Sequence, residues 1–266
     1  MLKINYNYHT HTKRCGHASG EDEEYVLAAI KVGIKELGFS DHIFYPGLSQ
    51  KPIRQDGSDF DDYVNSISNL REKYKDKIKI FLGFEAEYIE GFEDFYKTIL
   101  DNPKIDYLIC GNHCYYENNE WHWYFNSPNN KQDISRYVDR TIKAIESGLF
   151  LYIAHPDIFL NWYTDRDDFI IDQIRQICQK AKEYNLPLEI NLEGAKHKVH
   201  LESLGQEPYY YPHDIFWQIA SEVGNDIVVG IDAHNPDSLI FNHIDIAETI
   251  INKYKLRTNL NSLLSQ

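Results

Sequence analysis

Histidine and carboxylate side chains follow several short apolar runs in this chain. The first group is His9-Thr10-His11, with His17 six residues later. Residues i and i+2 of an extended segment point to the same side, so His9 and His11 could bind one metal ion. Taken alone, this pair fits an ordinary strand end equally well. The same residue types recur at five later points, which are His42, Glu85, His113, His155, and Asp232 with His234.

Together these nine side chains predict a site with more than one metal ion. A catalytic zinc ion takes about three protein ligands plus water, so the set implies two or three ions. Imidazoles and carboxylates without thiolates suit Zn, Mn, Fe or Co. A carboxylate such as Glu85 can bridge two ions, whereas an imidazole cannot. Clustered divalent ions generate hydroxide near neutral pH and can neutralise the charge of a phosphoryl group.

Alternating apolar runs and helical stripes must position these side chains. Strands are predicted at 4–8, 39–40, 78–84, 105–110, 150–154, 187–192 and 227–231. Helices are predicted at 21–37, 60–74, 91–100, 134–145, 170–184, 213–223 and 239–254, with Gly38 ending the first of them. Strands that alternate with helices indicate an α/β protein with a parallel sheet.

The candidate ligands converge most simply if this sheet closes into a barrel, with the site at the C-terminal ends of the strands. An open doubly wound sheet is the alternative. No shift in composition divides the chain, so residues 1–266 are predicted to form one domain. The segment 46–58 is interpreted as a lid or a plain surface loop. The aromatic stretch 115–130 is interpreted as a loop that walls a pocket or packs on the barrel rim.

The composition restricts the classes of partner that the protein could bind. A net charge of -14 gives no general attraction to nucleic acid or to a membrane surface, so a bound anion would require positive charge that is local to its site. Bound metal ions could supply the positive charge that such an anion needs. The N-terminus lacks a signal-peptide pattern and no apolar run could span a membrane, so a cytoplasmic protein is predicted. Cys110 and Cys114 flank His113 and are interpreted as small buried residues rather than ligands or disulfide partners.

The complete motif set resembles that of the polymerase-and-histidinol-phosphatase (PHP) superfamily over nearly the whole chain. The motifs are His9-Thr10-His11 with His17, Ser40-Asp41-His42, Gly83-Phe84-Glu85, His113, Ala154-His155-Pro156-Asp157 and Asp232-Ala233-His234. Their spacing and the segment Cys15-Gly16-His17-Ala18 are most similar to the histidinol-phosphatase branch. The resemblance implies a distorted (β/α)7 barrel. It also implies metal-assisted hydrolysis of a small phosphomonoester, most closely a histidinol-phosphatase activity, which releases L-histidinol and phosphate in histidine biosynthesis.

The resemblance further implies three divalent ions in a trinuclear centre. The implied ligand sets are His9, His11, Glu85 and Asp232; Glu85, His113 and His155; and His17, His42 and His234. A hydroxide bridging the first two ions would attack phosphorus. Asp41 is the candidate acid for the departing alkoxide, or else a carboxylate that orients a ligand histidine. His17 is grouped with Asp41 as a residue of the catalytic step.

The residue that binds the phosphate is less clearly marked. The family usually has an arginine after the sixth strand, where this chain has Lys196, His197 and Lys198. A lysine could act there as a point charge without the bidentate fork of arginine. Arg166, after the fifth predicted strand, is another candidate. Each of these side chains is also consistent with a solvated surface residue.

Three other functions stay open. A PHP phosphoesterase could act on nucleotides or sugar phosphates, although the acidic charge disfavours polynucleotides. A non-catalytic metal-binding barrel is disfavoured because every expected ligand position is filled. A metal-dependent amidohydrolase is disfavoured because no lysine accompanies the candidate ligands at a strand end.

Overall fold

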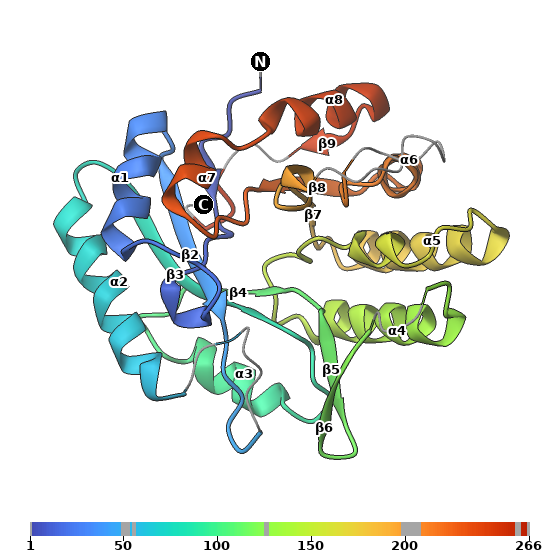
Figure 1. Cartoon of the computed structure of the whole chain (residues 1–266), viewed down its shortest axis with the longest axis horizontal. Helices are drawn as coiled ribbons and strands as arrows, with labels where there is room; N and C mark the ends of the chain where they lie inside the picture. Colours follow the sequence, from blue (N-terminus) through green and yellow to red (C-terminus); the bar gives the residue numbers. More distant parts are fainter. Residues whose placement is uncertain are drawn as a thin grey trace.

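The computed structural model describes residues 2–48, 54, 57–124, 128–197, 209–258 and 262–264. Within these ranges the parallel strands lie inside and the helices surround them (Figure 1). The first sheet consists of β1 (Tyr6–Asn7), β2 (Glu36–His42), β3 (Lys79–Ala86) and β4 (Tyr107–Cys110), in that order. The second consists of β7 (Leu188–Asn191), β8 (Asp226–Gly230) and β9 (Arg257–Thr258).

Single parallel bridges connect the two sheets at both sides. Ile153 pairs with Cys110 and with Leu188, and Thr10 pairs with Ala233. The chain therefore has an α/β fold with a curled parallel sheet, as the alternation of strands and helices predicts. All pairs within the two sheets are parallel, so the C-terminal ends of the strands face the same side. The register of β2 and β3 sets His42 opposite Glu85 at that side.

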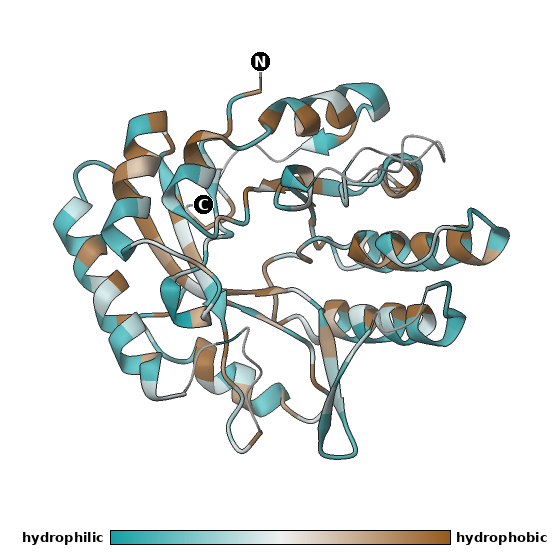
Figure 2. Ribbon diagram, in the orientation of Figure 1, coloured by the Kyte–Doolittle hydropathy of each residue, from teal (hydrophilic) through white to brown (hydrophobic). Residues whose placement is uncertain are grey.

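Amphipathic helices cover the outside of the sheet. They are α1 (Asp22–Val32), α2 (Phe60–Tyr74), α3 (Glu93–Leu100), α4 (Lys131–Ser147), α5 (Asp168–Glu183), α6 (Asp214–Val223), α7 (Pro236–Ile240) and α8 (Ile244–Tyr254). Figure 2 shows hydrophobic and hydrophilic residues on the same helices. Their buried stripes, such as Ile134, Tyr137 and Val138 of α4, follow the predicted helical spacing. No helix in the described part of the chain is long and apolar enough to cross a membrane.

Besides the main hydrophobic core, a smaller and mostly aromatic core fills the space inside the curled sheet. Tyr6, Tyr8, Tyr107, Tyr152 and Val228 belong to it and are almost fully buried. The Tyr107 hydroxyl donates to the carbonyls of Tyr8 at 2.7 Å and Phe39 at 3.1 Å, so the buried phenol is satisfied. This core holds the strands that carry the candidate ligands at fixed distances from one another.

The predicted helix 21–37 is wrong at its C-terminal end. Helix α1 ends at Val32, because Gly33 adopts a left-handed conformation with φ of 84°. Gly38 lies inside β2, where a Cβ atom would approach the Tyr107 hydroxyl to 2.3 Å. The predicted strand 39–40 is correspondingly too short. All seven residues of β2 are buried. Buried and exposed positions therefore do not alternate along this strand, and the sequence pattern assigns its first residues to the end of the preceding helix.

Three other local predictions also differ from the structure. The predicted strand 150–154 is reduced to the bridging residue Ile153. The predicted loop 115–130 contains the antiparallel hairpin of β5 (Cys114–Glu117) and β6 (Glu120–Trp123). Asn118 and Asn119 both have positive φ, as a tight hairpin turn requires. The predicted helix 239–254 is divided into α7 and α8, and His243 between them has φ of 50°.

Candidate metal centre

A backbone connection between the two sheets brings the first and last candidate ligands together. The amides of His11 and Ala233 donate to the carbonyls of Ala233 and His9, at 2.9 and 3.1 Å. The side chain of Asn7, at the end of β1, accepts from the amide of Ile231 and donates to the carbonyl of His9. Residues more than 200 positions apart are thereby aligned.

Glu85 lies at the centre of the predicted ligands and is buried. Its Oε2 lies 3.4 Å from both His9 Nε2 and His11 Nε2, and 3.2 Å from His42 Nδ1. Its Oε1 lies 2.9 Å from His155 Nε2 and 3.8 Å from His113 Nε2. One carboxylate therefore faces five imidazoles, an arrangement suited to ligands that share bound cations.

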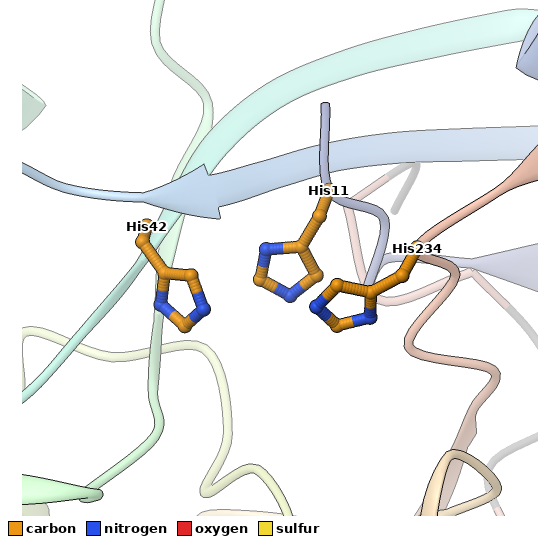
Figure 3. A group of neighbouring side chains, drawn as sticks. All are labelled: His11, His42 and His234. Atoms are coloured by element: carbon orange, nitrogen blue, oxygen red, sulfur yellow. The ribbon is translucent and has the colours of Figure 1, made fainter. Parts of the chain in front are cut away.

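Asp232 and His234 complete the cluster on the side of β8. Asp232 Oδ1 lies 3.1 Å from His11 Nε2 and 3.5 Å from His9 Nε2. The Nε2 atoms of His234 and His17 are 3.0 Å apart. In Figure 3 the rings of His11, His42 and His234 come from three separate segments and lie around a common space. The structure thus brings together all nine predicted ligand side chains.

The cluster meets the requirements of metal binding. In the described part of the chain, four sets have ligand atoms close enough to hold an ion, namely His11, His42 and His234; His9, Glu85 and His155; His9, His11 and Asp232; and His11, Cys15 and Asp41. Within the described ranges, the buried atoms His9 Nε2, His11 Nε2 and Asp232 Oδ1 have no hydrogen-bond partner. Buried polar atoms without a partner are costly, and metal coordination would satisfy them. The first set contains His11, whereas the sequence resemblance implied His17 in that position.

The electrostatics of the cluster also favour cations. Burial opposes protonation of His9, but the carboxylates of Asp232, Glu189 and Glu85 raise its pKa well above the usual range. Burial likewise opposes ionisation of Glu85, but the nearby His9, His42 and His113 keep its pKa well below the usual range. Burial lowers the pKa of His234 to about 3. The carboxylates thus remain ionised, whereas His9 must lose a proton before it can bind a metal ion.

Two of the expected ligands have unusual backbone conformations. His155 has φ of 30° and Asp232 has φ of 53°, both in the left-handed region. Such conformations cost roughly 1–3 kcal/mol each and concentrate at functional sites. The two residues follow the pairing positions of Ile153 and Gly230, and both are buried.

A second group of carboxylates lies behind the candidate ligands. Glu189 Oε1 lies 3.0 Å from His9 Nδ1, Asp41 Oδ1 lies 3.5 Å from His11 Nδ1, and Glu87 Oε1 lies 3.4 Å from His113 Nδ1. All three carboxylates are buried. Carboxylates in this position orient ligand histidines and fix the nitrogen that carries the proton.

Sequence reasoning missed Glu87 and Glu189. Both had a signal in the sequence. Glu87 follows Glu85 at i+2, and Glu189 is an acid inside an apolar strand. Asp41 was considered, and it also accepts hydrogen bonds from Thr12 and from the amide of His42. These contacts fit the orienting alternative for Asp41.

A cavity of about 230 Å³ opens beside the cluster. Besides predicted ligands it is lined by Trp123, Ile158, Glu193 and Tyr211. Trp123 belongs to β6, so the aromatic stretch does contribute a wall, as one of its two interpretations held. Ile158, Glu193 and Tyr211 were not predicted, and their spacing in the sequence gives no sign of the convergence.

The predicted phosphate contacts are mostly directed elsewhere. Lys196 pairs with Glu193 and donates to Ser238 at 2.9 Å. His197 is 57% exposed, with its Nε2 3.8 Å from Glu193 Oε1. Arg166 is exposed and donates to the carbonyl of Tyr163 at 2.8 Å. None of these three lines the cavity, and Lys198 lies outside the described residues.

The fold and the cluster define an α/β protein with a candidate multinuclear metal centre at the strand ends. The profile of the PHP domain family matches residues 7–193. The chain belongs to this family.

Known proteins of similar sequence and structure agree with this assignment. A Deinococcus radiodurans protein named "Probable histidinol-phosphatase" is 27% identical over 256 residues, which is 91% of each chain. A Listeria monocytogenes structure aligns with a TM-score of 0.70 and 21% identity, covering 88% of this chain and 96% of that one. The Lactococcus lactis histidinol phosphate phosphatase, in complex with zinc, L-histidinol and phosphate, aligns with a TM-score of 0.68 and 19% identity, covering 96% and 95%.

Proposed function

We propose that the chain is a metal-dependent histidinol-phosphatase, which hydrolyses L-histidinol phosphate to L-histidinol and phosphate. The observation that carries the proposal is the convergence of the eight other predicted imidazole and carboxylate ligands around Glu85, beside a cavity, in a PHP domain protein. The Deinococcus radiodurans relative supports this choice of substrate, since it matches nearly the whole chain.

The ligand residues are assigned to cation binding on their chemistry. Glu85 and Asp232 each belong to one set with His9, and His17 and His113 lie at the edges of the cluster. Divalent ions held by these residues would neutralise phosphoryl charge and lower the pKa of water. Without bound cations the carboxylates of Glu85, Asp232 and Glu193 at the cavity would repel a phosphate group.

The remaining side chains at the site serve orientation and substrate enclosure. Asp41 holds His11, because its carboxylate faces His11 Nδ1 and is buried away from the cavity. Trp123, Ile158 and Tyr211 would cover the organic part of a bound phosphomonoester and limit its contact with water. Proton donation by Asp41 and a direct catalytic role of His17 remain predictions.

Four finer features belong to the same proposal. Joining the two sheets through the bridges of Ile153 and Thr10 would give a closed barrel of seven strand segments. The whole chain would form one domain. Three ions would occupy the ligand sets, with zinc, manganese, iron or cobalt as candidates. The protein would act on a small molecule, without nucleic acid. It would be located in the cytoplasm.

Phosphate release from L-histidinol phosphate tests the proposal, beside a panel of nucleotides and sugar phosphates and with metal content measured on the same sample. Preference for L-histidinol phosphate with two or three ions per chain is the expected result. Activity on other phosphomonoesters alone would refute the proposed substrate and retain the metal chemistry. Bound metal without hydrolysis of any panel member would refute the enzymatic function. Glu85→Gln, which keeps the side-chain shape, should lose both metal and activity.

A further inference from the structure

Arg54 has a fully buried side chain behind the candidate metal centre. Its Nη1 donates to Glu87 Oε2 at 2.6 Å and its Nη2 donates to Glu87 Oε1 at 3.0 Å. The guanidinium carbon lies 4.6 Å from the centre of the Trp121 ring and 5.2 Å from that of Tyr45. A two-point pair of this kind fixes the plane of the carboxylate as well as its position.

Glu87 connects this pair to a predicted ligand. Its Oε1 lies 3.4 Å from His113 Nδ1, while His113 Nε2 faces Glu85 and the cavity. An imidazole that binds an ion through one nitrogen carries its proton on the other, and a carboxylate acceptor fixes the ring orientation. The direction of His113 Nε2 therefore depends on where the Glu87 carboxylate is held.

The three carboxylates behind the ligands are held in different ways. Glu189 accepts from the Asn191 amide at 2.8 Å, and Asp41 accepts from Thr12, so both have neutral donors. Glu87 instead has a cationic partner. A buried carboxylate without such compensation is strongly unfavourable. The guanidinium thus allows a charged acceptor to remain behind His113.

We propose that Arg54 is a positioning residue of the metal centre, which acts through Glu87 to orient His113. The inference rests on the proposed metal-binding role of His113. It gives a function in the site to a residue between β2 and α2, a stretch that contains no predicted ligand. It also explains the residue type, because lysine lacks the fork that engages both carboxylate oxygens.

The test compares Co²⁺ binding by the full chain carrying Arg54→Met, Arg54→Lys or Arg136→Met. Arg136 is the matched control, since it lies 4.5 Å from the Tyr115 ring and donates to the Tyr115 hydroxyl at 3.0 Å. It thus packs on the same hairpin as Arg54, but the carboxylate that it faces is that of Asp133, at 3.5 Å, and not that of Glu87. Titration against a chelator gives affinity, and the visible spectrum of bound Co²⁺ reports its ligand geometry.

Arg54→Met should weaken one class of Co²⁺ sites by about 10–100-fold and alter the spectrum. Arg54→Lys should fall between this variant and the wild type, while Arg136→Met should match the wild type. Wild-type affinity and spectrum in Arg54→Met would overturn the inference. An equal loss in Arg136→Met would also overturn it, since the effect would then come from the hairpin. Failure of the wild type to bind Co²⁺ would instead refute the proposed metal site.

Arg54→Met leaves Glu87 buried without its cation, so the variant could fail to fold. The double variant Arg54→Met/Glu87→Gln removes both charges and retains similar volumes, which buried ion pairs often tolerate. It should fold, as judged by circular dichroism, and should still bind Co²⁺ more weakly than the wild type, because an amide is a weaker acceptor than a carboxylate. Wild-type binding by the double variant would overturn the inference.

Discussion

Gly111 lies directly against the central carboxylate, so Gly111→Ala should disrupt the metal centre. A Cβ atom at this position would lie 1.8 Å from Glu85 Oε1 and 2.6 Å from its Cδ. Normal contact distances are about 3.5 Å, so the carboxylate or the backbone must move by more than about 1.5 Å. Metal ligands keep their distances to within roughly 0.2 Å. A shift of this size is therefore incompatible with coordination through Glu85.

The expected result is a folded variant with less metal. Overpacking of this kind costs about 1–3 kcal/mol, which urea unfolding in the presence of chelator would measure. Elemental analysis should show the loss of at least one ion per chain, with a parallel loss of phosphatase activity. Gly38→Ala is the control, because its Cβ would meet the Tyr107 hydroxyl at 2.3 Å, away from the carboxylate. Gly111→Ala with full metal content and activity would refute the reasoning.

Three further predictions concern the surroundings of the ligands. Glu189→Gln should lower metal affinity by about 10–100-fold through His9, as measured by chelator competition; an unchanged affinity would contradict the role of Glu189. In the metal-free protein, burial lowers the pKa of His11, but the nearby carboxylates of Asp232 and Asp41 raise it to about 9. His11 is then protonated at pH 7, so Zn²⁺ binding should release protons into a weak buffer. The affinity for Zn²⁺ should rise as the pH increases towards 9. Binding without proton release would contradict the protonated state of His11. Asp41→Asn should weaken metal binding and regain turnover in excess Zn²⁺, whereas low turnover at full metal content would identify Asp41 as the proton donor.

The fold class was predictable because strand and helix patterns alternate clearly along the chain. The errors lie where a local signal competes with tertiary packing. Residues 36–42 are buried on all sides, so β2 lacks the alternation by which a strand is recognised. Ile153 pairs through single bridges on both sides, and a single paired residue leaves no strand pattern of its own.

The sequence by itself determined the types of the candidate ligands and their positions after apolar segments, because metal chemistry restricts the usable side chains to a few. His9, Glu85, His155 and Asp232 were identifiable in this way. Only the tertiary structure decided which atoms face one another. It directs Asp41 towards His11, recruits Glu87 and Glu189 behind the ligand rings, and turns Lys196 towards Glu193. Those pairings depend on strand register and on contacts between residues far apart in the chain, which residue spacing does not encode.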